Sequence, residues 1–380
     1  MEYVIHLTEK CNLNCKYCYE KNNKNSKIQD ISFDNIKALI DYVTNQKEKY
    51  NIIYFYGGEP LLRKDIIKET INYINSKKSK TKFYYSITTN GTLLDDAFIN
   101  YMKQNKFIYI AYSIDGLKET QDLNRITFDN KGSFDIVEKN AKKVLNTFDS
   151  VIAMVAVTKN NLHYLSKNIE YLINLGFNHI NLQFNYLDNW QDDDLKEIKK
   201  QYSKIASIYA DKIMQECDLE IPIIDDKIKT YVNDKYNCND NCQFGMKTIN
   251  VGTDGNFYPC MQFVNYDEFI IGNCKDGIDK QARLNLIKNS KKEQNICKKC
   301  AIRKRCKHTC ECINFITTSD VNDLSPIICE TEKIFIEVAD KMAEQLHSQD
   351  SKMFIQKYYN KNYDTIKQFI SKYENKKQQY

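Results

Sequence analysis

Short apolar segments alternate with longer amphipathic segments through the first half of the chain. The apolar segments are rich in β-branched and aromatic residues, which is typical of buried strands. They span residues 3–7, 52–56, 82–88, 107–113, 151–157 and 179–184. Strands that alternate in this way with helical segments predict βαβ units and a parallel sheet.

The segments between these strands have the spacing of surface helices. Residues 34–43 place their apolar side chains on one helical face, and these side chains are Ile36, Leu39, Ile40 and Val43. Ser32 precedes this segment and is a favourable N-cap residue. Another predicted helix ends at Leu175, because Gly176 can adopt the left-handed conformation that closes a helix.

The order of the elements predicts an α/β fold. Six βα units over residues 1–187 predict a parallel sheet that curls into a partial (β/α)6 TIM-like barrel. Residues 188–237 are polar and mostly helical, as between Asp192 and Met214, and we interpret them as a connector. Residues 238–330 hold ten of the 14 cysteines, with short strands and turns, and predict a small domain stabilised by metal. Residues 331–380 predict a charged helical tail.

The composition of the chain argues against several classes of protein. The net charge of +5 comes from 55 basic and 50 acidic residues, which does not indicate nucleic-acid binding. No apolar stretch is long enough to span a membrane, and the first residues lack the pattern of a signal peptide. We therefore expect a cytoplasmic protein. Thiols stay reduced in that compartment, so the 14 cysteines favour metal or cluster ligation over disulfides.

Three cysteines follow the first predicted strand directly. Cys11, Cys15 and Cys18 have the spacing Cys-x3-Cys-x2-Cys. Three thiolates can hold three corners of a four-iron cluster and leave the fourth iron open to a ligand. A structural zinc site would require a fourth ligand, which this loop does not supply. Functional loops of such sheets lie at the carboxyl ends of the strands, where this loop falls.

Polar turns follow the next three strands as well. In the Tyr-Gly-Gly-Glu-Pro turn, Gly57 and Gly58 would allow close backbone approach to a ligand, and Glu59 could accept a hydrogen bond from an amine. The segments Ser86–Gly91 and Ser113–Gly116, the latter followed by Arg125, add further polar groups at the same edge. The alternative for each is an ordinary turn, since Gly-Gly, Asn-Gly and Asp-Gly are common turn pairs.

Together these motifs resemble the radical S-adenosylmethionine (SAM) enzymes over about the first half of the chain. The resemblance implies that Cys11, Cys15 and Cys18 hold a [4Fe–4S] cluster whose open iron binds SAM. SAM would be cleaved reductively to methionine and a 5′-deoxyadenosyl radical, which removes hydrogen from the substrate. The residues implied to contact SAM are Tyr17, Gly57, Gly58, Glu59, Ser86, Asn90, Ser113, Asp115 and Arg125. No catalytic residue is assigned beyond these.

The C-terminal cysteines resemble the SPASM extension of this superfamily, which holds two auxiliary [4Fe–4S] clusters, giving three clusters in all. The resemblance assigns the first auxiliary cluster to Cys242, Cys260 and Cys310, with Cys238 as a candidate fourth ligand. Without Cys238 that cluster would have an open iron. The second auxiliary cluster is assigned to Cys297, Cys300, Cys306 and Cys329. A four-thiolate zinc site at Cys297, Cys300, Cys306 and Cys310 is the alternative.

The stretch Tyr258–Val264, followed by Phe269–Asn273, resembles maturases that form thioether links in ribosomally made, cysteine-rich peptides. A formylglycine-forming sulfatase maturase would have a basic Asp after the Tyr-Pro-Cys motif, where this chain has Met261. Met cannot accept a proton. Sulfatase-type maturation and peptide epimerisation, the latter with Cys312 as a thiol hydrogen donor, are retained as alternatives. A zinc-bound interaction module is the non-enzymatic alternative.

The resemblance also predicts partners. We expect a cysteine-containing precursor peptide as substrate and a reduced flavodoxin or ferredoxin as electron donor. The first strand begins at Tyr3, which leaves no space for the N-terminal leader-binding domain of many maturases. A separate peptide-recognition protein is therefore one candidate partner, with the connector and residues 331–380 as others. Nucleic acid and membrane partners are not expected.

Overall fold

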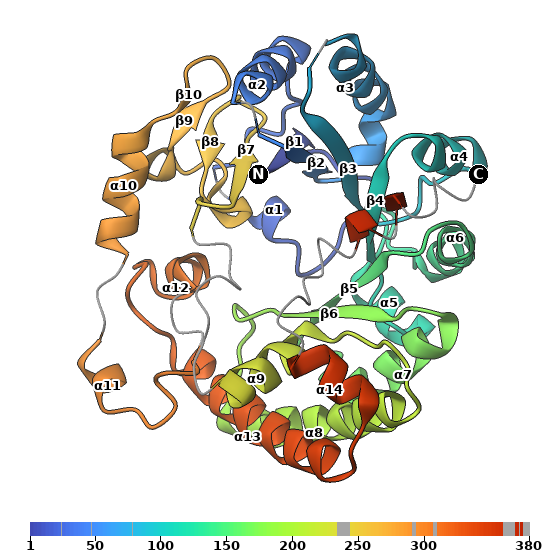
Figure 1. Cartoon of the computed structure of the whole chain (residues 1–380), viewed down its shortest axis with the longest axis vertical. Helices are drawn as coiled ribbons and strands as arrows, with labels where there is room; N and C mark the ends of the chain where they lie inside the picture. The colour runs from blue at the N-terminus through green and yellow to red at the C-terminus, as the bar shows by residue number, and fades with distance from the viewer. Residues whose placement is uncertain are drawn as a thin grey trace. The chain divides into compact units, whose positions relative to one another are not determined.

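The computed structural model describes most of the chain as two compact units (Figure 1). The first unit comprises Met1–Tyr112, Asn124–Phe148 and Asn241–Lys291, and the second comprises Ser113–Leu123, Asp149–Asp240 and Lys292–Tyr380. Within these bounds, the described residues are 1–23, 25–46, 48–77, 79–233, 244–290, 294–306, 310–359, 369–371 and 373–374.

Four parallel strands form the centre of the first unit. They are β1 (Glu2–Thr8), β2 (Tyr50–Gly57), β3 (Lys82–Thr89) and β4 (Phe107–Ser113), and they lie in the order β4-β3-β2-β1. The connecting helices line one side of these strands in Figure 1. These helices are α2 (Phe33–Asn45), α3 (Lys64–Ser76), α4 (Asp96–Gln104) and α6 (Phe134–Thr147).

The apolar pattern of the sequence explains this packing. Every β1 residue from Tyr3 to Leu7 is buried, as expected of a parallel strand that is covered on both faces. In α2 the four predicted core residues, Ile36, Leu39, Ile40 and Val43, are all buried. The side chain of Ser32 accepts a hydrogen bond from the amide of Asn35 at 3.2 Å. The predicted helix and its N-cap are therefore confirmed.

A strand from the cysteine-rich half extends the same sheet. β7 (Thr248–Val251) pairs in parallel with β1, so that Glu2 lies opposite Thr248 and Ile5 opposite Val251. β8 (Phe257–Tyr258) then pairs antiparallel with β7. The same unit also contains the short hairpin β9 (Gly272–Asn273) and β10 (Gly277–Ile278), followed by α10 (Lys280–Asn289). The strand pattern alone did not indicate that β7 joins β1, because this pairing links residues more than 240 positions apart.

The second unit combines two parallel strands with helices. β5 (Val151–Val157) pairs with β6 (His179–Phe184), and the helices are α5 (Lys118–Asn124), α7 (Leu165–Leu175), α8 (Asp192–Met214), α9 (Pro222–Asn233), α11 (Asn295–Lys298), α12 (Glu311–Thr318), α13 (Pro326–Ser348) and α14 (Lys352–Tyr359). α7 ends at Gly176, which has the left-handed φ of 115° that the sequence predicts.

The main expectations about secondary structure are confirmed. All six predicted strands are present within two residues of their predicted ends, and α8 has the predicted bounds of 192 and 214. The α/β class with a mostly parallel sheet and a helical C-terminal region is confirmed too. Within the described part of the chain, no helix is long and apolar enough to span a bilayer.

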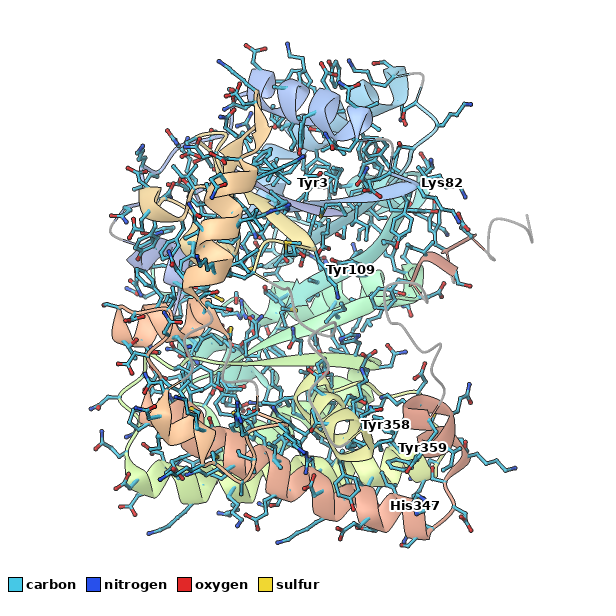
Figure 2. The ribbon with its side chains drawn as sticks, turned by 60° about the vertical axis from the view of Figure 1, so that its left-hand side comes forward. Tyr3, Lys82, Tyr109, His347, Tyr358 and Tyr359 are labelled. Carbon is cyan, nitrogen blue, oxygen red and sulfur yellow. The ribbon has the colours of Figure 1, made fainter. Side chains whose placement is uncertain are left out.

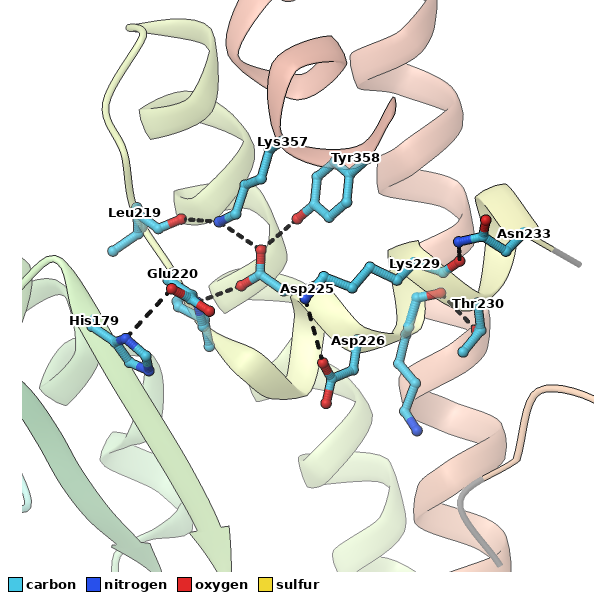
Figure 3. Close-up of polar contacts among 12 residues, drawn as sticks. His179, Leu219, Glu220, Asp225, Asp226, Lys229, Thr230, Asn233, Lys357 and Tyr358 are labelled. Carbon is cyan, nitrogen blue, oxygen red and sulfur yellow. Dashed lines mark hydrogen bonds and ion pairs between the residues drawn. The ribbon is translucent and has the colours of Figure 1, made fainter. Parts of the chain in front are cut away.

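A buried ion pair attaches α14 to α9 in the second unit (Figure 3). The ammonium of Lys357 lies 2.6 Å from Asp225 Oδ1, and both side chains are 1% exposed. The hydroxyls of Tyr209 and Tyr358 donate hydrogen bonds to the same carboxylate oxygen. Burial by itself would raise the pKa of Asp225, but Lys357 and the hydrogen bond from Tyr358 outweigh it and lower the pKa. The carboxylate is therefore held ionised inside the unit.

Aromatic contacts complete the attachment of α14. Figure 2 shows Tyr358 and Tyr359 on α14 and His347 near the end of α13. The ring centroids of His347 on α13 and Tyr359 on α14 are 6.2 Å apart, whereas the contact between Phe354 and Tyr358 at 5.0 Å lies within α14 itself. Charged and aromatic contacts together thus fix α14 against the rest of its unit.

The ion pair predicts a large effect of one substitution on stability. Lys357→Met keeps the length of the side chain but leaves a buried carboxylate without its cation. The free energy of unfolding of the second unit should fall by about 3–5 kcal/mol, measured by urea denaturation. The matched control is Lys199→Ala, because the Lys199–Glu337 pair joins α8 to α13 at 2.8 Å but is about half exposed. The control substitution should lower the free energy of unfolding by about 1 kcal/mol or less. Equal stability of the two variants would contradict the assigned role.

Candidate functional site

The three N-terminal cysteines lie in the loop between β1 and α1 (Tyr19–Asn22), and each is half-buried. Burial, together with the nearby Glu59, Cys15 and Cys18, raises the pKa of the Cys11 thiol to about 12. The three thiols are thus close enough to interact electrostatically. Thiols with raised pKa values are protonated at neutral pH, so metal binding here would release protons.

A second segment of the first unit runs beside this loop. The amide of Lys16 donates a hydrogen bond to the carbonyl oxygen of Asn124 at 3.0 Å. The adjacent Arg125 is 8% exposed, and its guanidinium lies 5.4 Å from the ring centroid of Tyr17. Burial raises the pKa of Cys18, and the charge of Arg125 opposes this rise. The structure therefore brings Tyr17 and Arg125, both predicted site residues, to the cysteine loop.

The two glycines of the Gly-Gly-Glu-Pro turn allow β2 to approach the base of the cysteine loop. The amides of Gly58 and Glu59 donate hydrogen bonds to the carbonyl oxygens of Thr8 and Lys10, at 2.8 and 2.9 Å. A Cβ atom on Gly58 would lie 2.3 Å from the oxygen of Lys10, and one on Gly57 would lie 2.3 Å from that of Thr8. Gly57 also has a left-handed φ of 124°. The close approach seen here is to the protein's own backbone, and contact of the glycines with SAM stays a prediction.

The carboxylate of Glu59 is fully enclosed at the end of β2. It caps the short helix η1 (Pro60–Arg63) by accepting from the amide of Leu61 at 3.0 Å. It also accepts from the hydroxyl of Thr89 and the amide of Asn90, both at 2.7 Å. Burial raises the pKa of Glu59 to about 7, although these three hydrogen bonds favour the ionised form. Glu59 thus joins the ends of β2 and β3, and its predicted contact with the amine of SAM stays a prediction.

Polar side chains continue this network from β3 to the cysteine loop. The side-chain nitrogen of Asn90, Nδ2, donates hydrogen bonds to Asn12 Oδ1 at 2.9 Å and to Cys11 Sγ at 3.7 Å. Asn12 in turn donates to the hydroxyl of Thr92 at 2.8 Å. The backbone amide of Leu13 lies 3.4 Å from Cys11 Sγ and donates to it as well. Asn90 was predicted to be a SAM contact, and in the structure its side chain contacts a predicted cluster ligand.

Ser86 lies deeper in β3, among hydroxyl and aromatic groups. It is buried and pairs in register with Tyr54 of β2 and Tyr109 of β4. On the same side of the strands the hydroxyls of Tyr54 and Thr88 lie 2.5 Å apart, and Tyr109 donates to Glu2 at 2.9 Å. Figure 2 labels Tyr109 within the first unit. This part of the sheet is therefore polar although it is buried.

Glu9 connects the cysteine loop to the segment that carries Cys260. Its carboxylate accepts from the hydroxyl of Thr253 at 2.7 Å and from the amide nitrogen of Asn265 at 3.1 Å. It also accepts from the hydroxyl of Ser26. Burial tends to raise the pKa of Glu9, but these hydrogen bonds outweigh it and lower the pKa. Sequence reasoning missed Glu9, because no local pattern reveals that its partners Thr253 and Asn265 lie more than 240 positions away.

Two predicted SAM contacts belong to the second unit. Ser113 is half-buried, and Asp115 is fully buried after the end of β4. Asp115 Oδ1 accepts from the amide of Ala156 at 3.0 Å, so the carboxylate joins this turn to β5. Gly116 has a left-handed φ of 128°, and a Cβ atom there would lie 2.3 Å from Asn168 Cβ. These contacts give the turn a structural role, and the proposed contacts with SAM stay predictions.

The second unit also brings predicted cluster cysteines together. Cys297 lies in α11, Cys300 follows it, and Cys329 lies in the first turn of α13. Burial raises the pKa of the Cys329 thiol, and the neighbouring Cys297 and Cys300 raise it further. Three thiols that the sequence assigns to one auxiliary cluster are therefore neighbours.

An arginine fixes the segment that carries Cys306. The guanidinium of Arg305 forms a two-pronged ion pair with Asp340 of α13, with Nη1 2.7 Å from Oδ2. Its Nε atom donates to the hydroxyl of Thr230 on α9 at 3.1 Å. Such paired geometry is both strong and directional. The residue before Cys306 is thereby attached to two helices of the unit.

The remaining cysteines differ in their surroundings. The sulfurs of Cys310 and Cys312 are 3.5 Å apart, and this contact, together with burial, raises the pKa of Cys310. Cys260 is half-buried at the start of the turn η4 (Met261–Phe263) in the first unit. Cys238 and Cys242 lie outside the described residues. Among the residues described, no three His, Cys, Asp or Glu side chains are arranged to hold a single metal ion.

The close backbone approach predicts that Gly58→Ala displaces the cysteine loop. The added Cβ would meet a backbone oxygen, which cannot move aside as a flexible side chain could. After anaerobic reconstitution, this variant should bind less iron per chain than the unaltered protein. The control is Gly176→Ala, which strains the left-handed end of α7 but does not touch the loop. Equal iron content in both variants would contradict the role given to Gly58.

The raised pKa of Glu59 predicts a pH dependence of stability. The unfolded chain ionises this carboxyl above about pH 4.5, whereas the folded chain keeps its proton up to about pH 7. The free energy of unfolding should therefore fall as the pH rises through this window, by up to about 3 kcal/mol, and then level off. Glu59→Gln should lack this component when urea midpoints are compared from about pH 5 to about pH 8. Parallel pH profiles of the two proteins would contradict the prediction.

Comparisons with known proteins agree with this arrangement. Residues 5–172 match the Radical SAM superfamily. The chain is 29% identical over 355 residues to the cysteine-type anaerobic sulfatase-maturating enzyme of Clostridium perfringens (strain 13 / Type A), covering 87% of this chain and 93% of that relative.

Solved structures show the same fold. The structure of His6-tagged anSMEcpe with bound AdoMet superimposes with a TM-score of 0.79 at 23% identity, covering 92% of this chain and 99% of that one. The structure of Streptococcus suis SuiB bound to S-adenosylmethionine gives a TM-score of 0.61 at 15% identity, covering 86% and 76%. The resemblance drawn from the cysteine loop and the Gly-Gly-Glu-Pro turn is thereby confirmed. Residues 5–172 form a radical SAM domain, and the chain that contains this domain is an enzyme.

Proposed function

We propose that this enzyme is a peptide maturase that acts on cysteine residues of a ribosomally made precursor and forms thioether crosslinks. The observation that supports a peptide substrate is the similarity of nearly the whole chain to a sulfatase-maturating enzyme, whose substrate class is a protein. Two structural neighbours were solved with peptides, anSMEcpe with the Cp18Cys peptide and SuiB with its precursor peptide SuiA. We extend that substrate class to this chain.

The superfamily implies a [4Fe–4S] cluster and SAM, and the cysteine loop fits them. Cys11, Cys15 and Cys18 are neighbouring thiols on one loop, and cysteine thiolates are the ligands that hold such clusters. When bound, the cluster and SAM supply a 5′-deoxyadenosyl radical that removes hydrogen. The protein's part is to hold the loop through Gly58 and Glu59 and to place the cation of Arg125 beside Cys18.

We further propose two auxiliary clusters. Thioether formation removes a hydrogen atom from a peptide carbon, a proton from a thiol, and one further electron, which requires an acceptor. The neighbouring thiols of Cys297, Cys300 and Cys329 support one auxiliary site, with Cys306 as its fourth ligand. Cys260 and Cys310, with Cys242 and the candidate Cys238, would hold the other. A reduced flavodoxin or ferredoxin would supply electrons, and a separate protein would assist in peptide recognition.

The residue after Cys260 supports one of the two candidate reactions. Met261 begins the turn η4 directly after this cysteine, and its thioether group cannot act as a base. This observation favours thioether formation, since a formylglycine-forming enzyme is expected to have an Asp there. Formylglycine formation is the second candidate, because the relative that matches over 87% of the chain is a cysteine-type sulfatase-maturating enzyme.

The proposal predicts a specific product. The chain is co-expressed without oxygen with a cysteine-rich peptide encoded near its gene, and the peptide is analysed by mass spectrometry. Thioether formation would remove two hydrogens per crosslink and protect the cysteine from alkylation. Loss of sulfur with a new aldehyde would indicate formylglycine. Solvent deuterium incorporated in heavy water without a net mass change would indicate epimerisation. Either of these results would contradict the thioether proposal.

The auxiliary site supplies a matched variant for the same experiment. Cys260→Ala should retain some cleavage of SAM, because it leaves the N-terminal cysteine loop intact, but it should yield no modified peptide. The measurement compares 5′-deoxyadenosine with modified peptide in one reaction. Full peptide turnover by this variant would contradict a role of Cys260 in the modification.

A further inference from the structure

The side-chain amide of Asn90 is positioned as a hydrogen-bond donor to a sulfur. Asn90 follows β3 and is 7% exposed. Its Nδ2 atom lies 3.7 Å from Cys11 Sγ, and the amide of Leu13 approaches the same sulfur at 3.4 Å. Cys11 therefore has one backbone donor and one side-chain donor. A substitution can remove the side-chain donor while the backbone donor remains.

The surrounding contacts determine which end of the Asn90 amide faces the sulfur. Asn90 Oδ1 accepts from the backbone amide of Thr92 at 3.0 Å and from its hydroxyl at 2.6 Å. On the other side, Nδ2 also donates to Asn12 Oδ1 at 2.9 Å. The backbone amide of Asn90 is bound to the carboxylate of Glu59 at 2.7 Å. Reversing the amide would place donor against donor at Thr92, so this network selects the orientation with nitrogen toward Cys11.

We propose that Asn90 is a positioning residue that sets the reduction potential of the N-terminal cluster through its hydrogen bond to the Cys11 thiolate. This inference rests on the proposed function only in taking Cys11 as a cluster ligand. It assigns Asn90 a role toward the sulfur rather than toward SAM. Glu59 and the backbone amide of Thr92 act through Asn90, since they hold its backbone and its side-chain oxygen, and the Thr92 amide stays in place when the Thr92 side chain is replaced.

The direction of the effect follows from charge. Reduction adds an electron to the cluster, and the thiolate sulfurs share the added negative charge. A donor to sulfur therefore stabilises the reduced state more than the oxidised state and raises the potential. Removing that donor should make the cluster harder to reduce, while the ligand itself stays in place.

The test is an anaerobic redox titration of the whole reconstituted enzyme. Electron paramagnetic resonance measures the amount of reduced cluster at each potential. The signal that changes when SAM is added identifies the N-terminal cluster. In Asn90→Ala the ratio of reduced to oxidised cluster at a fixed potential should fall about tenfold, equal to a shift of about 60 mV to more negative potential for a one-electron couple. Asn90→Asp keeps the acceptor for Thr92 and the side-chain shape, and should shift the potential in the same direction.

The matched control is Thr92→Val, which removes a hydroxyl from the network but no donor to sulfur. Its potential should stay close to that of the unaltered enzyme. An unchanged potential in both Asn90 variants at full iron content would overturn the proposal, as would weaker SAM binding without a shift. Failure of the underlying assignment is distinguishable, because Cys11→Ala would then retain the SAM-sensitive signal.

Discussion

The buried carboxylate of Glu59 is the contact on which the site in the first unit depends. It accepts three hydrogen bonds and joins the end of β2 to the end of β3. Its own backbone amide, together with that of Gly58, binds the base of the cysteine loop. One residue thus orders the carboxyl ends of three parallel strands. Because the carboxylate is fully buried, its hydrogen-bond partners cannot be exchanged for water without cost, and this fixes the loop geometry.

Two further carboxylates also join separate segments of the chain by accepting several hydrogen bonds. Glu9 connects the cysteine loop to the segment around Cys260 within the first unit, and Asp225 connects α9 to α14 within the second. In each case a charged group accepts several donors from segments that are distant in sequence. Hydrogen-bonded carboxylates and the Arg305–Asp340 pair thus hold together the segments that flank several of the predicted ligand cysteines.

Much of this arrangement could be predicted from the sequence, because it depends on local patterns. The β-branched runs predicted the strands, Ser32 and Gly176 predicted helix ends, and the cysteine spacing predicted the superfamily. The pairing of β7 with β1 and the contacts of Glu9 with Thr253 and Asn265 could not be predicted, since each joins residues more than 240 positions apart. The glycines of the Gly-Gly-Glu-Pro turn were expected to approach a ligand, yet the approach that requires them is to Thr8 and Lys10. A sequence motif can thus locate a functional site without showing which atoms each of its residues contacts.

The central claim is that the cysteine loop beside Glu59 supports reductive cleavage of SAM. The most direct test is the amount of 5′-deoxyadenosine formed when the anaerobically reconstituted chain is reduced with dithionite in the presence of SAM. The account predicts steady formation by the unaltered chain and none by Cys11→Ala, with the auxiliary cysteines unchanged. No 5′-deoxyadenosine from the unaltered chain with its full complement of iron, or equal amounts from both proteins, would contradict the account.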